Sequence, residues 1–215
     1  MLDDGDDDTP HLSADTLAAL QAFYEEQAER QQQEAAIQEG KISKGSLQED
    51  WQLSQFWYTD ETATRLAEEA LSVMGDNGKI ACISSPTAYK KIKELCPPNC
   101  EVRCLEYDTR FSMFREDFLF YDYKEPLRLP AEWRNRFDIV IADPPFLSEE
   151  CLCKVAQTVR FLTIGKVILN TGAILQETAL KLLGVRPCGF LPQHVGLQNE
   201  FLCYTNYDSK LLSST

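Results

Sequence analysis

Short apolar runs alternate along the chain with longer segments that carry an apolar residue at every third or fourth position. An apolar run without polar alternation is typical of a strand that is covered on both faces in a parallel sheet. Such runs predict five strands, at 79–84, 101–108, 118–123, 139–142 and 166–173. The helical spacing predicts helices over 60–74, 86–95, 148–162 and 175–184.

The alternation of strands and helices predicts an α/β fold with a doubly wound, mostly parallel sheet. Segments 185–196 and 199–209 predict two further strands in a terminal antiparallel hairpin, which brings the sheet to seven strands. Residues 46–215 are expected to form this domain. Residues 1–45 are expected to be an acidic, partly disordered segment that contains a helix starting near Ser13.

The net charge of −13 is concentrated in the first 40 residues, which hold 11 acidic side chains and one basic side chain. The rest of the chain is nearly neutral, and its longest basic cluster is KKIK at 90–93. A nucleic-acid binder would be expected to show a basic patch, and the sequence shows no long basic run. We therefore predict no nucleic-acid partner. The acidic balance favours a basic protein instead.

The start MLDDGDDD is unlike the cationic start of a signal peptide, and no apolar run approaches the roughly 18 residues of a membrane helix. We therefore expect a cytoplasmic protein without membrane association, whose eight cysteines stay reduced. No CxxC pair occurs and the chain has two histidines, so no metal site is expected.

The fourth predicted strand runs into the sequence DPPF, at Asp143 to Phe146. Pro144 and Pro145 have no N–H for a sheet or a helix, so the chain must leave the sheet there as an extended loop. Ligands of open α/β sheets bind at this edge. For a DPP tripeptide taken alone, a plain end of a strand is the alternative.

With the order of elements and the terminal hairpin, this loop resembles the (D/N/S)PP(F/Y/W) motif of class I methyltransferases that act on amino groups. Four stretches are similar, more narrowly, to the eukaryotic elongation factor 1-alpha lysine methyltransferase 1 family: QFWY at 55–58, LEYD at 105–108, YDY at 121–123 and IADPPF at 141–146. The similarity spans about Leu12 to Asp208. That family was formerly described as N6-adenine DNA methyltransferases.

The resemblance implies a Rossmann-like fold with S-adenosylmethionine as methyl donor. It also implies a monomeric enzyme whose partner is elongation factor 1-alpha, methylated on a lysine. The candidate catalytic residues are Asp143, Pro144, Pro145 and Phe146. Asp143 and the Pro144 carbonyl can accept hydrogen bonds from an amine, and Phe146 can offer a cation–π face to lysine or a stacking plane to a flipped base.

Candidate cofactor residues follow the predicted strands. The usual Gly-rich turn is absent after the first strand, and Ser84 and Ser85 are the expected substitute, a simple loop being the alternative. Glu106 is expected to bind the ribose hydroxyls, with Asp108 as its competitor. Asp122 is expected to accept from the adenine amino group, or else to be a surface acid. Asp143 is expected to contact the cofactor as well as the amine.

Phe56, Trp57 and Tyr58 precede the first predicted helix of the domain, where they can shield the sulfonium from water while Thr59 caps the helix. The alternative is a hydrophobic staple without a cofactor role.

Five more residues lie within or at the ends of predicted strands near this edge. Tyr121 and Tyr123 are interpreted as core or wall. His194, a lone histidine in a Pro-rich turn region, is interpreted as structural rather than as a general base. Asn199 and Glu200 are candidates to face the substrate.

The DPPF loop specifies a nitrogen acceptor better than it specifies lysine. A protein-lysine methyltransferase is the first hypothesis, favoured by the acidic N-terminal segment and the scarcity of basic runs. An adenine-N6 methyltransferase acting on DNA or RNA is the alternative, and it would need a positive groove and room for an extruded base. A catalytically silent binding module is a third possibility, suggested by the missing glycines and opposed by the intact DPPF.

Overall fold

The computed structural model describes residues 57–74, 78–195 and 201–213, which all belong to one compact unit from Gln48 to Thr215. The predicted N-terminal segment 1–45, Phe56, and the candidates Asn199 and Glu200 lie outside the described residues.

Helices and strands alternate along the described chain. They are, in order, α2 (Asp60–Met74), β1 (Lys79–Ile83), α3 (Pro86–Leu95), β2 (Glu101–Glu106), β3 (Phe118–Phe120), β4 (Ile139–Ala142), α4 (Glu149–Leu162), β5 (Lys166–Gly172), α5 (Gln176–Leu183), β6 (Arg186–Pro187) and β7 (Phe201–Thr205). Short 3-10 helices lie at Thr109–Asp117, Ala131–Trp133 and Ala173–Leu175.

The described strands form one sheet of seven, in the order β3-β2-β1-β4-β5-β7-β6. The first five strands of the chain pair in parallel, and β7 is inserted antiparallel between β5 and β6. The strand order reverses beside β1, which has β2 on one side and β4 on the other, and ligands bind at such a switch point. The predicted fold class is confirmed.

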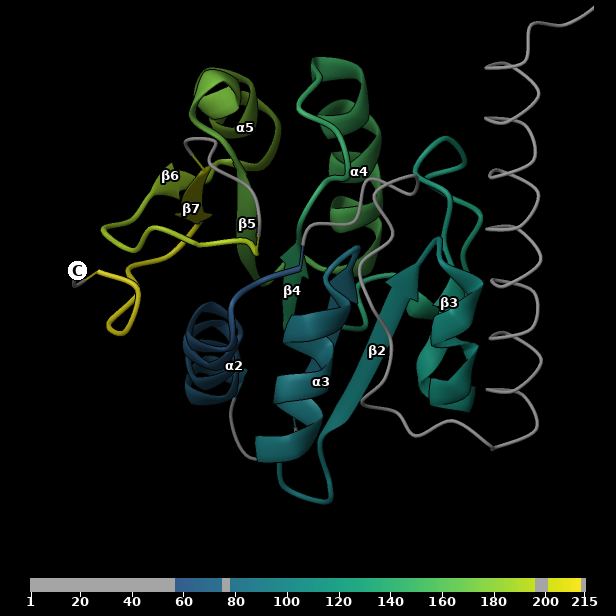
Figure 1. Cartoon of the computed structure of the whole chain (residues 1–215). Coiled ribbons are helices and arrows are strands. Elements are labelled where there is room, and N and C mark those ends of the chain that lie inside the picture. The colour runs from purple at the N-terminus through teal and green to yellow at the C-terminus, as the bar shows by residue number, and fades with distance from the viewer. Residues whose placement is uncertain (1–56, 75–77, 196–200, 214–215) are drawn as a thin grey trace, which may run out of the picture. The chain divides into compact units, whose positions relative to one another are not determined.

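Two helical layers cover the sheet, α2 and α3 on one face and α4 and α5 on the other (Figure 1). Alternate residues of β1 face the two layers: Ile80 packs with the side chains of α2 and α3, and Ala81 packs with those of α4 and α5. Burial on both faces explains why β4 is apolar at each of its four positions.

The ends of the helices follow local sequence signals. Ser148 caps α4 by accepting a hydrogen bond from the Cys151 N–H at 3.2 Å. Pro86 starts α3, where its missing N–H costs nothing. Gly184 ends α5 in the left-handed conformation, with φ of 67°.

Most predicted strands were too long, and the difference is clear at β2, β3 and β6. β2 ends at Glu106 because the Glu106 carboxylate accepts from the next two backbone N–H groups. β3 ends at Phe120, although the Tyr121 N–H still donates to Glu106 O at 3.0 Å, and the Tyr121 hydroxyl lies 2.8 Å from Thr158 Oγ1 in the core. The first strand of the hairpin shrinks to β6, whose Pro187 has no N–H for a ladder. Among the described residues, no helix is long and apolar enough to cross a membrane.

Candidate active site

Three predicted site residues lie side by side at the carboxyl edge of the sheet. The register pairs Ile83 of β1 with Leu105 of β2 and with Ala142 of β4. The residues that follow these three are Ser84, Glu106 and Asp143. Backbone hydrogen bonds continue the alignment, because the Ser84 N–H donates to Leu105 O at 2.8 Å and the Asp143 N–H donates to Ile83 O at 3.0 Å.

The Asp143 carboxylate is held by side chains from distant parts of the chain. His194 Nε2 lies 3.1 Å from Asp143 Oδ2, and the two side chains are 3% and 12% exposed. Burial raises the pKa of Tyr58, and the charge of Asp143 and a hydrogen bond to it raise that pKa further, so the Tyr58 hydroxyl stays protonated and donates to the carboxylate. Asn170 Nδ2 in turn donates to the Tyr58 oxygen at 2.8 Å.

Backbone pairing brings Tyr58 and His194 together. The two residues form an antiparallel bridge, and the Val195 N–H donates to Trp57 O at 2.8 Å. The two rings lie 4.8 Å apart between centroids. Sequence reasoning treated His194 as a structural residue of a turn and did not connect it with Asp143. It also gave Tyr58 a shielding role and missed both its hydroxyl and Asn170.

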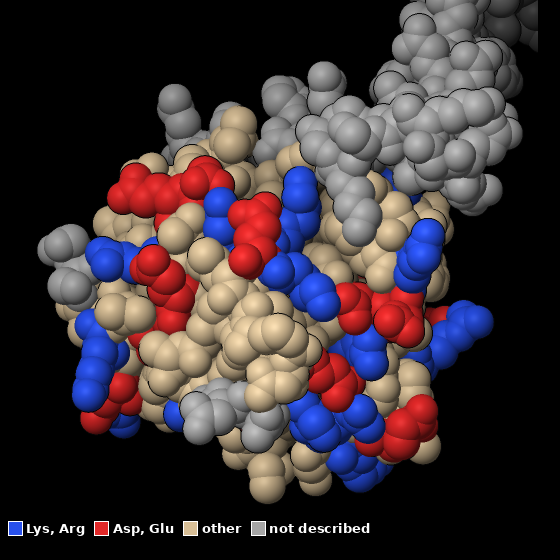
Figure 2. Space-filling view, turned by 90° about the horizontal axis from the view of Figure 1, so that it is seen from below, with Lys and Arg blue, Asp and Glu red and all other residues tan. Residues whose placement is uncertain are grey.

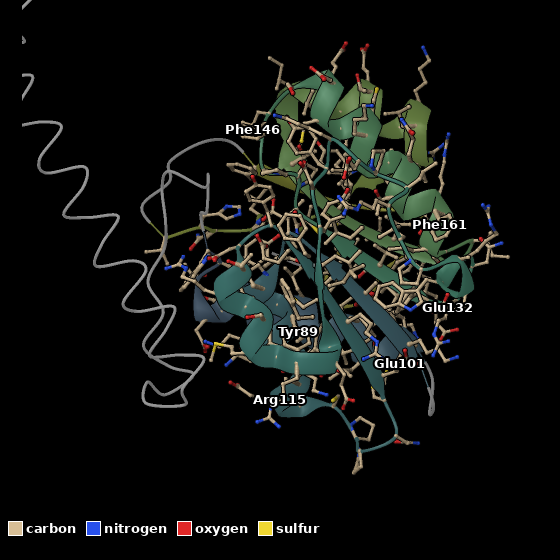
Figure 3. All side chains as sticks on the ribbon, turned by 90° about the vertical axis from the view of Figure 1, so that its right-hand side faces the viewer. Tyr89, Glu101, Arg115, Glu132, Phe146 and Phe161 are labelled. Atoms are coloured by element: carbon tan, nitrogen blue, oxygen red, sulfur yellow. The ribbon has the colours of Figure 1, made fainter. Side chains whose placement is uncertain are left out.

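The DPPF loop presents its aromatic ring at the surface. Pro144 is buried, whereas Phe146 is 45% exposed and packs edge-on against Tyr123, with ring centroids 5.7 Å apart. Figure 3 shows Phe146 at the opposite end of the sheet from Glu101, the first residue of β2. An exposed ring beside a carboxylate can receive the alkyl and amino groups of a lysine side chain.

The turn after β1 reproduces a glycine conformation without glycine. Ser84 has φ of 51°, in the left-handed region that favours glycine. Ser85, which follows it and precedes α3, is buried. The Gly-rich motif is therefore absent from the sequence, but Ser84 adopts the left-handed backbone conformation that glycine would favour. The chain turns at this position, at the carboxyl edge of the sheet.

Glu106 is the acid at the end of β2, and Asp108 is already committed to another partner. Glu106 Oε1 accepts from the N–H groups of Tyr107 at 2.9 Å and Asp108 at 3.2 Å. Burial raises the pKa of Glu106 to about 7, and the nearby charges of Asp108 and Asp143 contribute to the rise. Asp108 forms a buried ion pair with Arg110, 2.6 Å between Oδ2 and the guanidinium, so its carboxylate already has a charged partner in the structure.

Asp122 does not end a strand as predicted, because β3 stops at Phe120 and Asp122 lies in the following loop. Its Oδ1 accepts from the Lys124 N–H at 2.8 Å. Tyr121 is buried in the core as predicted.

Trp57 and Thr59, in the segment before α2, make different kinds of contact. Trp57 meets Phe111 edge-on, with ring centroids 6.1 Å apart, on the side of β2. Thr59 Oγ1 accepts from the Thr62 N–H at 3.3 Å, which confirms the predicted cap of α2.

The sheet order and the DPPF loop at its carboxyl edge define a class I methyltransferase. A family model described as "Probable N6-adenine methyltransferase" matches residues 49–209. Human "EEF1A lysine methyltransferase 1" is 54% identical over 213 residues, which is 98% of each chain. A "Protein-lysine N-methyltransferase" of Caenorhabditis elegans is 43% identical over 215 residues, 94% of this chain and 96% of the relative. The chain belongs to this family of methyltransferases.

Solved structures support the fold alone. The branched-chain polyamine synthase of Thermus thermophilus, crystallised with N4-aminopropylspermidine and 5'-methylthioadenosine, aligns with a TM-score of 0.53 at 14% identity. The alignment covers 76% of this chain and 60% of that one.

Proposed function

We propose that this protein transfers a methyl group from S-adenosylmethionine to a lysine side chain of eukaryotic elongation factor 1-alpha. The proposal is carried by the relatives named EEF1A lysine methyltransferase 1, which are 52–54% identical to this chain over 98% of its length. It extends the activity in the names of these relatives to this chain. We further propose that the protein acts as a monomer in the cytoplasm.

Two observations indicate that the described residues fit the methyl donor. The turn at Ser84 has the left-handed backbone of a Gly-rich motif, and Glu106 uses one carboxylate oxygen for backbone N–H groups, which leaves the other for ribose hydroxyls. When bound, S-adenosylmethionine supplies an electrophilic methyl group on its sulfonium. Ser84 and Glu106 would hold its methionine and adenosine parts respectively.

Asp143 orients the acceptor amine in this proposal. With Oδ2 bound to His194 and the carboxylate also bound to the Tyr58 hydroxyl, the group has one fixed orientation. It can accept an N–H of the lysine amine and so aim the nitrogen lone pair, once the ammonium has lost a proton to solvent. The exposed Phe146 ring contacts the alkyl chain and the amino group.

His194 serves as a positioning residue for Asp143. Replacing it with Phe removes the hydrogen bond to the carboxylate, and we expect kcat to fall about tenfold or more while the KM for S-adenosylmethionine changes little. His194→Gln keeps a donor near the same place and should restore part of the rate. A purely structural role predicts equal losses for both variants, with lower thermal stability.

Adenine is disfavoured as the acceptor. Figure 2 shows acidic and basic side chains interspersed over the face at the amino ends of the strands, so this face, opposite the DPPF loop, offers no continuous basic surface for a phosphate backbone. The curated relatives carry names of protein-lysine methyltransferases, although the family model keeps the adenine description.

The test uses radiolabelled S-adenosylmethionine with two acceptors, recombinant elongation factor 1-alpha made in bacteria and an adenine-containing oligonucleotide. We expect label on the protein, located at lysine by peptide mass spectrometry, and none on the oligonucleotide. Asp143→Asn should reduce the rate at least a hundredfold while S-adenosylhomocysteine still binds. Label on the oligonucleotide alone would overturn the proposal.

A further inference from the structure

An exposed apolar strip borders the candidate active site. It consists of Phe146, Leu147 and Ile174, which are 45%, 40% and 84% exposed. Leu147 follows Phe146 in the loop after β4, and Ile174 lies in the turn after β5. Single exposed apolar residues need no explanation, but neighbouring ones beside a site mark an interaction surface.

Close contacts show that the strip is continuous. A Cβ placed on Gly172 would lie 3.1 Å from Leu147 Cδ2 and 3.6 Å from Ile174 Cγ2, so the two side chains flank this glycine. At the other end, the Phe146 ring packs on Tyr123. The strip thus runs from the β3–β4 side of the site across β4 to the end of β5. The absence of a side chain at Gly172 lets the Leu147 side chain approach the end of β5.

Acidic residues border the strip on its α4 and α5 side. Glu149 and Glu150 lie in the first turn of α4, and Glu177 lies in the first turn of α5. The Thr178 hydroxyl donates to Glu149 Oε1 at 3.1 Å, which links the two helix ends. These helices both start at the carboxyl edge of the sheet, so their acids stand on the same side of the molecule as Asp143.

We infer that this strip is the docking surface for the segment of the substrate protein that flanks the target lysine. The occupant is an extended segment with an apolar side chain next to the lysine and a basic residue beyond it. The apolar side chain covers Leu147 and Ile174, and the basic residue faces Glu150 and Glu177. The inference rests on the proposed function, because it assumes a protein acceptor whose lysine reaches Asp143.

The chain offers a matched pair of exposed isoleucines for the test. Ile174 is 84% exposed in the strip, and Ile164 is 86% exposed at the start of β5, the opposite edge of the sheet. With recombinant elongation factor 1-alpha as substrate, Ile174→Ser should raise the KM for the protein about tenfold, and the loss should lie in KM rather than in kcat. Ile164→Ser should match the wild type. Binding of S-adenosylhomocysteine, measured by calorimetry, should be the same in all three proteins.

The acidic border is tested by salt. The double variant Glu150→Gln/Glu177→Gln should raise the KM for the protein about threefold to tenfold at low ionic strength, and this difference should shrink above about 0.5 M salt because exposed charges are screened. The exposed acids Glu68 and Glu132 provide the control double variant. They lie outside the strip.

The outcomes separate the two proposals. If the wild type does not label elongation factor 1-alpha, the proposed function fails. If the wild type labels it and Ile174→Ser has the KM of the Ile164→Ser control, the docking surface is wrong while the function stands. A loss of S-adenosylhomocysteine binding in Ile174→Ser would also overturn the docking role, because the residue would then act on the cofactor site.

Discussion

Replacing Glu106 by Gln tests both the stability cost of a buried carboxylate and the proposed contact of Glu106 with the ribose. The side chain is 6% exposed, and burial raises the pKa from an ordinary value of 4.5 to about 7. Between these two pKa values the folded protein binds more protons than the unfolded chain, so stability falls as the pH rises from about 4.5 to about 7. Above that range the ionised Glu106 destabilises the fold by about 3 kcal/mol, since one pKa unit corresponds to about 1.4 kcal/mol.

Gln fits the same space and can still accept from the N–H groups of Tyr107 and Asp108. At pH 8, where wild-type Glu106 is ionised, we expect Glu106→Gln to be more stable by about 3 kcal/mol, or about 6 to 12 °C in Tm for a unit of this size. Near pH 4.5, where Glu106 is protonated in the folded protein and only half ionised in the unfolded chain, the two proteins should differ by less than about 1 kcal/mol. Glu68→Gln, at an exposed position of α2, should show no such pH dependence.

The measurement is urea unfolding at both pH values, with S-adenosylhomocysteine titrated calorimetrically in parallel. A ribose hydroxyl bound to a carboxylate contributes about 1.5 to 3 kcal/mol, so Glu106→Gln should bind S-adenosylhomocysteine about tenfold or more weakly at pH 8. Stability and affinity should therefore move in opposite directions. An equal stability gap at the two pH values would refute the burial argument, and undiminished affinity would refute the ribose assignment.

Further substitutions test three local features of the site: the Tyr58 hydroxyl, the Asp108–Arg110 ion pair and the turn at Ser84. Tyr58→Phe removes the donor to Asp143 and the acceptor of Asn170 Nδ2. We expect the free energy of unfolding in urea to fall by about 1 to 3 kcal/mol and kcat for methylation to fall as well. A variant with wild-type activity and stability would contradict this hydrogen-bond network. Arg110→Met removes the buried ion pair with Asp108 and should cost about 3 to 5 kcal/mol in urea unfolding, of which the double variant with Asp108→Asn should recover most. Ser84→Gly should keep or raise Tm by relieving a strain of about 1 kcal/mol, and Ser84→Val should lower Tm clearly; tolerance of Val would show that the left-handed turn is not needed.

The periodicity of the sequence predicted most elements because it reports burial directly. The bounds of α3 were predicted to the residue, the apolar run 139–142 coincides with β4, and α2 begins near the predicted position at Asp60. Two predicted strands were too long because the chain leaves the sheet after Glu106 and after Phe120. Glu106 binds the backbone beyond β2, and Tyr121 turns inward after β3. Neither event changes the apolar pattern, so no count of polar and apolar positions could have located these strand ends.

The sequence by itself determined which edge of the sheet carries the chemistry. Ser84, Glu106 and Asp143 each follow an apolar run, and parallel strands of similar length must end at one edge. DPPF also marked the loop that leaves the sheet. These are local properties, fixed by residues that are neighbours in the chain.

Only the tertiary structure decided what surrounds those residues. His194 is 51 positions from Asp143, and Asn170 is 112 positions from Tyr58, yet both pairs are hydrogen-bonded. Such contacts depend on strand order, on the insertion of β7 beside β5 and on a single bridge between Tyr58 and His194. A side chain at a given spacing can meet many partners in an unfolded chain, and packing of the whole sheet selects one of them.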